Sequence, residues 1–129
     1  MKVRVAIAIL FVLATLTAFA PAFTFIGSYD TKAGFVAVDN FSNFYTTENN
    51  RLSKFSPDGK FLYPYEELRY GKIGMVDVNN PLKILVYYPD FSTVITLDRF
   101  LSPLNTYNFF ELGYQNITAV GSSIDGRIW

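Results

Sequence analysis

The sequence predicts an all-β fold built from repeated four-stranded units, as in part of a β-propeller. Short apolar runs are separated by turns rich in Asp, Asn, Ser and Gly, and this layout recurs about every 40 residues. No stretch outside the amino-terminal leader shows sustained helical periodicity. We therefore expect two four-stranded antiparallel blades plus the start of a third, with units at about 34–67, 71–104 and 115–129. A single irregular sandwich with evenly spaced turns is the alternative.

The first unit reads as four strands that follow one another along the chain, at 35–38, 44–47, 51–55 and 60–65. Glu48-Asn49-Asn50 suits a tight hairpin, because Asn tolerates a left-handed backbone. Ser56-Pro57-Asp58-Gly59 places Ser, Pro and Gly at the first, second and fourth positions of a type I turn, where each is favoured. Gly59 is therefore expected to have a positive φ and to close the third hairpin.

The second unit repeats this layout, with strands expected at 73–76, 82–88, 93–97 and, as a short outer strand, 100–101. Val38-Asp39 recurs as Val76-Asp77, and Val94 and Leu97 take the places of Leu52 and Phe55. The neighbours Tyr87 and Tyr88 must face opposite sides of their strand.

Beyond the second unit, residues 103–113 are either a long loop between blades or one helical turn. A third unit starts with a strand at 117–120 and a turn at Asp125-Gly126. Because that unit stops at Trp129, soon after its first turn, we expect the chain to be a fragment of a longer propeller.

The first unit resembles an NHL-type β-propeller repeat, a pattern shared with gluconolactonase-like proteins. The matching residues are Val38-Asp39, Asn43-Phe44-Tyr45, Asn50-Arg51, Phe55 and Asp58-Gly59, and the match covers about one blade. Ser42 departs from it, because the family usually has glycine there. The resemblance implies a propeller protein of the bacterial cell envelope. Its gluconolactonase-like side implies a metal-dependent lactone or ester hydrolase, with the metal held by acidic residues from several blades.

The amino terminus has the features of a secretory signal peptide at 1–22. Lys2 and Arg4 precede an apolar run, and small residues for cleavage follow at 18–22. An uncleaved anchor is the alternative, because the apolar stretch is about long enough to span a bilayer at ~20 residues. We expect cleavage after Ala20 or Ala22, which leaves 23–129 as an exported repeat region that is periplasmic, associated with the outer membrane, or secreted. The membrane is a partner only if the leader stays uncleaved.

Composition excludes several kinds of chemistry. The chain has no Cys and no His, so disulfides, thiol catalysis, imidazole ligands and a Ser-His-Asp triad are absent. Eleven basic and eleven acidic residues give a net charge of zero without a basic stripe, which argues against nucleic-acid binding. Asp39, Asp77 and Asp125 stand in equivalent turns and offer oxygen ligands that suit calcium. No spacing matches a calcium loop, so the sequence assigns no cofactor, no metal site and no catalytic residue.

The aromatic residues are first of all packing residues of an all-β protein. Some could instead stack on a glycan or anchor a protein partner, because a tyrosine ring combines large area with a polar edge. The candidate contacts are Tyr63, Tyr65, Tyr70, Tyr107 and Trp129. The resulting prediction is an exported, non-catalytic propeller scaffold or binding module of the cell envelope, with a hydrolase fragment as the alternative.

Overall fold

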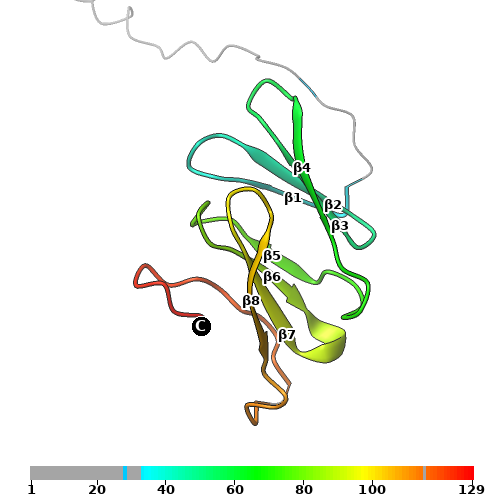
Figure 1. Cartoon of the computed structure of the whole chain (residues 1–129), viewed down its shortest axis with the longest axis vertical. Coiled ribbons are helices and arrows are strands. Elements are labelled where there is room, and N and C mark those ends of the chain that lie inside the picture. Colours follow the sequence, from blue (N-terminus) through cyan, green and yellow to red (C-terminus); the bar gives the residue numbers. More distant parts are fainter. Residues whose placement is uncertain (1–27, 29–32, 115) are drawn as a thin grey trace, which may run out of the picture.

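The computed structural model describes residues 28, 33–114 and 116–129, and this part of the chain is all-β. Eight strands form two four-stranded antiparallel sheets, and in each sheet the strand order follows the chain (Figure 1). The first sheet contains β1 (Phe35–Val38), β2 (Phe44–Glu48), β3 (Arg51–Phe55) and β4 (Phe61–Glu66). The second contains β5 (Met75–Asp77), β6 (Ile84–Tyr88), β7 (Thr93–Leu97) and β8 (Pro103–Asn108), with the 3-10 turn η1 (Pro89–Phe91) between β6 and β7. The all-β prediction is confirmed, and the leader lies outside the described residues.

The first sheet follows the sequence prediction closely. β1 and β3 have the predicted bounds, while β2 is one residue longer and β4 is displaced by one residue. Glu48 pairs with Arg51, which leaves Asn49-Asn50 as the two-residue loop of the hairpin. Asn49 has a φ of 55°, the left-handed conformation that Asn adopts more readily than most residues.

One five-residue turn recurs four times in the described part of the chain, at 39–43, 56–60, 98–102 and 123–127. In each copy the N–H of the first residue donates to the C=O of the fifth, and the N–H of the fourth donates to the C=O of the first. The fourth residue has a positive φ in every copy: Ser42, Gly59, Leu101 and Gly126. Asp39 and Asp98 also accept the N–H groups of the third and fifth residues of their turns. The Asp and Ser residues of these segments therefore serve as turn formers.

The outer strand predicted at 100–101 is wrong, because these residues lie inside the turn 98–102. The fourth strand is β8, so the loop or helical turn expected at 103–113 is wrong for 103–108, while 109–113 form a turn, and the second unit extends beyond Leu104. β8 is an edge strand rich in Asn and Thr, and most of its residues are exposed. Such a strand lacks the apolar alternation on which the sequence prediction depends.

The predicted alignment of Val38 with Val76 is also displaced. Val36 pairs with Thr46 just as Val76 pairs with Val86, so Val36 occupies the position that corresponds to Val76. The strand pairing of the two sheets is otherwise alike. Each sheet has a register shift one residue before the turn that leads into its last strand. The displacement is two residues: the Val-Asp pair recurs after 38 residues, whereas the pairs Ala37–Tyr45 and Asp77–Leu85 repeat after 40.

The two sheets pack through one core, which we call the seam. Tyr45, Leu52 and Tyr65 of the first sheet are buried together with one face of the second sheet, formed by Val76, Val78, Ile84, Val86, Tyr88, Ile95, Leu97 and Leu101. Tyr87 faces the opposite side of β6 from Tyr88, as expected, and joins a second core. The seam therefore buries the inward faces of both sheets.

The second core is covered by the carboxy-terminal segment. Val120 is buried with Leu85, Tyr87 and Val94, and Ile117 and Ile128 pack against them. Residues 121–129 turn back as a small hairpin, with Gly121 and Trp129 exchanging two backbone hydrogen bonds. The turn predicted at Asp125-Gly126 is thus present, but 117–120 does not form the predicted strand.

Replacing Gly59 by valine is expected to lower the free energy of unfolding by roughly 1–3 kcal/mol, because a β-branched residue is strained at positive φ. Gly59 has a φ of 83°. Gly34→Val is the matched control, since a Cβ at Gly34 would make only ordinary contacts of 3.9 Å with Thr47. Thermal unfolding of both variants checks this expectation. Equal melting temperatures for the two variants would contradict the hairpin geometry.

Candidate functional site

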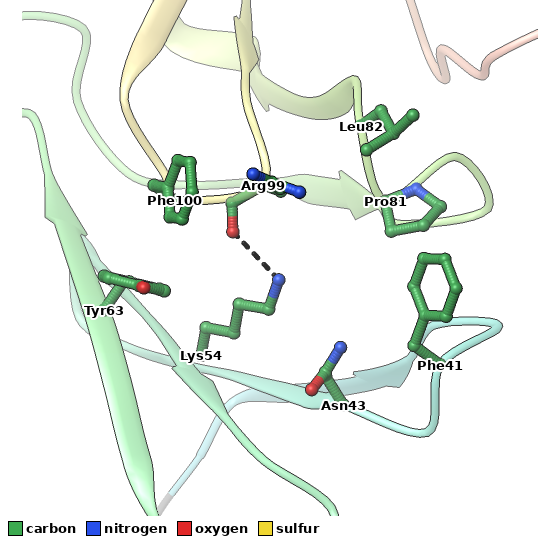
Figure 2. A pocket seen from close by; sticks show the side chains of 8 residues that line it. All are labelled: Phe41, Asn43, Lys54, Tyr63, Pro81, Leu82, Arg99 and Phe100. Atoms are coloured by element: carbon green, nitrogen blue, oxygen red, sulfur yellow. Dashed lines mark hydrogen bonds between the residues drawn. The ribbon is translucent and has the colours of Figure 1, made fainter.

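A pocket of about 310 Å³ lies between the two sheets, and we call it the seam pocket. Four of its residues come from the first sheet and its turns, and four come from the second (Figure 2). They are Phe41, Asn43, Lys54 and Tyr63, and Pro81, Leu82, Arg99 and Phe100. The pocket therefore exists only where the two sheets are packed together.

Lys54 is the charged residue at the centre of this pocket. The alternation of β3 places Lys54 on the same inward face as Leu52, and only 5% of Lys54 is exposed. Its Nζ donates a hydrogen bond of 2.9 Å across the seam to the backbone O of Arg99, and lies 5.3 Å from the centroid of the Tyr45 ring. An ammonium has three donors. Among the described residues, Arg99 O is its one hydrogen-bond acceptor and no carboxylate is within ion-pair distance.

Burial lowers the pKa of Lys54 below its usual range, because the charged form loses hydration. The negative charge of Asp39 offsets part of this decrease in pKa, and the positive charge of Arg99 adds to the decrease. A buried ammonium with one acceptor is unfavourable for folding. Its position beside a pocket is the kind of arrangement that marks functional sites.

Asp39 holds the wall of the pocket in place from within the first sheet. Its carboxylate accepts the N–H groups of Phe41 and Asn43, two bonds from the Asn43 side chain, and the Tyr45 hydroxyl at 2.9 Å. Burial alone would raise the pKa of Asp39, but these hydrogen bonds outweigh it and hold the pKa below its usual range. Burial and the bond to Asp39 raise the pKa of Tyr45. The carboxylate is thus engaged in its own turn.

The rim of the pocket carries large apolar side chains that remain in contact with solvent. Phe41 is 66% exposed, Leu82 60% and Phe100 45%. Phe41 and Pro81 lie on one side of Lys54, and Tyr63 and Phe100 on the other (Figure 2). Tyr63 meets Phe100 edge to face at 5.4 Å. An apolar body placed between these walls would cover surface that is now exposed to water.

In the second sheet, a threonine occupies the position that corresponds to Lys54. Thr96 pairs with Leu85 as Lys54 pairs with Tyr45, so the two residues are equivalent in register. Thr96 is buried, and its hydroxyl is paired with the backbone of Asn105 on the neighbouring strand. The second sheet therefore has a neutral side chain at the position of Lys54.

The five aromatic residues predicted as contacts lie in separate places. Tyr63 lines the seam pocket. Tyr65 is buried in the seam, Tyr70 packs beside Tyr88 at 5.8 Å, and Tyr107 packs in the second core. Trp129 is exposed on the carboxy-terminal hairpin. The structure thus brings Tyr63 alone of this set to the pocket.

The acidic residues of the predicted turns do not converge. Asp77 accepts Asn79 N–H and both the N–H and the hydroxyl of Ser122, and Asp125 pairs with Arg127 at 3.2 Å. Within the described ranges, no three Asp, Glu, His or Cys side chains are grouped in a way that could hold a metal ion. The carboxylates of Asp39 and Asp77 are already used as acceptors of local hydrogen bonds.

Lys54, Arg99, Phe41 and Phe100 were not identified from the sequence as site residues. The available signal was Lys54, a charged residue on the inward side of a strand together with Leu52. The other three come from turns, whose positions across the seam depend on how the sheets pack.

Comparison with protein-family models and with curated proteins gives no match for this chain. In the part of the chain that the structure describes, no helix is long and apolar enough to cross a membrane.

Proposed function

We propose that the chain is an exported, non-catalytic binding module of the cell envelope, built from propeller-type blades, and that the seam pocket is its ligand site. The observation that carries the proposal is Lys54, an ammonium buried at 5% exposure beside a pocket of about 310 Å³ with one protein acceptor. A charged side chain that lines a pocket is a feature of ligand sites. The hydrolase alternative has no specific observation in its favour.

The succession of units supports the propeller part of the proposal. The first sheet packs on the second, and the second packs in turn on the carboxy-terminal hairpin, through equivalent residues such as Leu52 and Val94. The corresponding turns of the three units also gather, since Asn40 donates to Asn79 O at 3.2 Å and Ser122 donates to Asp77 at 2.7 Å. A regular stack in which each unit covers the next is the packing of propeller blades.

The outer face of the first sheet also supports repeated blades. Val36 is 55% exposed, whereas its equivalent Val76 is 4% exposed because the first sheet covers it. An aromatic row on that outer face consists of Phe44, Phe55 and Phe61. The rings of Phe44 and Phe55 are stacked with their centroids 4.9 Å apart. In the propeller proposal, a further blade packs on this face.

Export is expected to remove the leader after Ala20 or Ala22, because a charged start, an apolar run and small residues match what signal peptidase recognises. Mass spectrometry of the protein recovered from an expressing bacterium checks this expectation. Intact Met1 in the membrane fraction would contradict cleavage and favour a membrane anchor.

The binding proposal is tested by nuclear magnetic resonance titration of the folded protein with benzoate, 2-naphthoate, 2-naphthamide and 2-naphthol. We expect at least one compound to shift the backbone signals of Asn43, Lys54, Tyr63, Arg99 and Phe100. These residues lie on both sides of the seam. If all four compounds leave these signals unchanged, the seam pocket is not a site for small aromatic ligands and the proposal fails.

A further inference from the structure

We infer that the seam pocket selects a ligand with a carboxylate attached to a flat apolar body, and that Lys54 and Arg99 recognise the carboxylate. This inference rests on the proposed function, because it names the ligand class of the same site. It follows from three features of the pocket: the charges that line it, the hydrogen-bond donors that remain open, and the apolar walls on either side.

The charges that line the pocket are both positive. Lys54 and Arg99 belong to the lining, and no Asp or Glu does. Asp39 and Asp98 are the acidic residues whose charges raise the pKa of Lys54. Both carboxylates accept backbone N–H groups within their own turns, so their oxygens serve the turns rather than the pocket. An anion entering the pocket therefore meets donors.

The donors that face this anion are available. Lys54 gives one of its three protons to Arg99 O, and Arg99 has no carboxylate within ion-pair distance among the described residues. The Arg99 guanidinium lies over the Phe100 ring at 4.6 Å, so it is positioned by stacking. Arginine presents two parallel N–H groups that match a carboxylate, and a nearby ammonium adds a further charge-assisted hydrogen bond.

The apolar walls determine the rest of the ligand. Phe41 and Pro81 face Tyr63 and Phe100 across Lys54 (Figure 2). A flat ring inserted between them would cover exposed apolar surface and lie beside aromatic faces. An anion without an apolar body gains only the polar contacts. We therefore expect inorganic phosphate to bind more weakly than an aromatic carboxylate.

The experiment compares 2-naphthoate with its neutral analogue 2-naphthamide by isothermal titration calorimetry. We expect 2-naphthoate to bind the wild-type protein about tenfold more tightly, the gain from one good charge-assisted contact. Lys54→Met keeps the apolar stem and removes the charge, so it should reduce this preference several-fold and leave only the part that Arg99 supplies. Lys60→Met is the matched control, because Lys60 is exposed and does not line the pocket.

A second variant keeps the test valid if Lys54→Met folds poorly. Arg99→Gln changes an exposed side chain and leaves the backbone O that Lys54 uses, so it should fold normally and weaken 2-naphthoate binding several-fold. Equal affinities for 2-naphthoate and 2-naphthamide at the seam pocket would overturn the inference while the proposed function stands. Absence of binding by every probe would instead remove the proposed function.

Discussion

Replacing Asp39 by alanine is expected to lower the free energy of unfolding by about 3 kcal/mol, because the buried Tyr45 hydroxyl and several part-buried donors lose their acceptor at once. The carboxylate of Asp39 accepts bonds from Phe41, Asn43 and the buried Tyr45 hydroxyl. Chemical denaturation monitored by circular dichroism measures the change.

Asp98→Ala is the matched control. Asp98 occupies the first position of the same five-residue turn and accepts the same two backbone N–H groups, from Phe100 and Ser102. Unlike Asp39, it has no buried hydroxyl donor among the described residues and is only partly buried. We expect a loss of about 1 kcal/mol, the usual value for one turn or cap. Equal losses at Asp39 and Asp98 would show that the buried network adds nothing.

The effect of Asp39 should also depend on pH. Its pKa is lower in the folded chain than the ordinary value of 3.8, so the unfolded state binds its proton first as the pH falls. The stability that this group contributes is therefore present above pH 3.8 and is lost as the pH falls through the folded-state pKa. The difference between wild type and Asp39→Ala should shrink below pH 3.8.

Leu52→Ala is expected to lower the free energy of unfolding by about 3 kcal/mol, because it opens a cavity in the seam. Leu52 is fully buried within the core that joins the two sheets. The control is Val36→Ala, on the opposite face of the same sheet, where the side chain is 55% exposed. We expect that control to lose less than about 1 kcal/mol, the range of strand propensity alone.

Equal effects of Leu52→Ala and Val36→Ala would contradict the conclusion that the Leu52 face of the first sheet packs on the second sheet. The comparison is informative because both substitutions shorten an apolar side chain within a strand of the same sheet. Their burial differs most, because Leu52 is fully buried and Val36 is 55% exposed. The result therefore reports on the packing of the sheets.

The strands could be predicted from the sequence wherever side chains alternate and turns have strong signals. Asn49-Asn50 and Ser56–Gly59 mark the turns of the first sheet, and the predicted bounds there are correct to within one residue. The prediction failed at β8, where Asn105, Thr106 and Asn108 give no apolar period. The left-handed Leu101 was also missed, because nothing in its own side chain indicates that conformation.

The seam pocket could not be predicted, because its residues are distant in sequence and meet only through packing. Lys54 and Arg99 are separated by 45 positions and come from different sheets. The sequence does place Lys54 on an inward face beside Leu52. Which carbonyl it meets depends on the angle and register of two sheets, which no local pattern encodes, whereas the Tyr45 ring lies opposite it in the same sheet. Tyr65, Tyr70 and Tyr107, which the sequence offers as contacts, pack instead in the two cores.

The pKa of Lys54 in the folded protein tests the account most directly, since it reports whether this ammonium is buried in the seam. It can be followed through the 13Cε signal of Lys54, assigned by comparison with Lys54→Met, as the pH is raised. We expect Lys54 to titrate below the ordinary lysine value of 10.5 in the folded chain, and at that value after unfolding in urea. A folded-state titration at 10.5 or above would mean that Lys54 is solvated or paired with an acid, and would contradict the seam pocket described above.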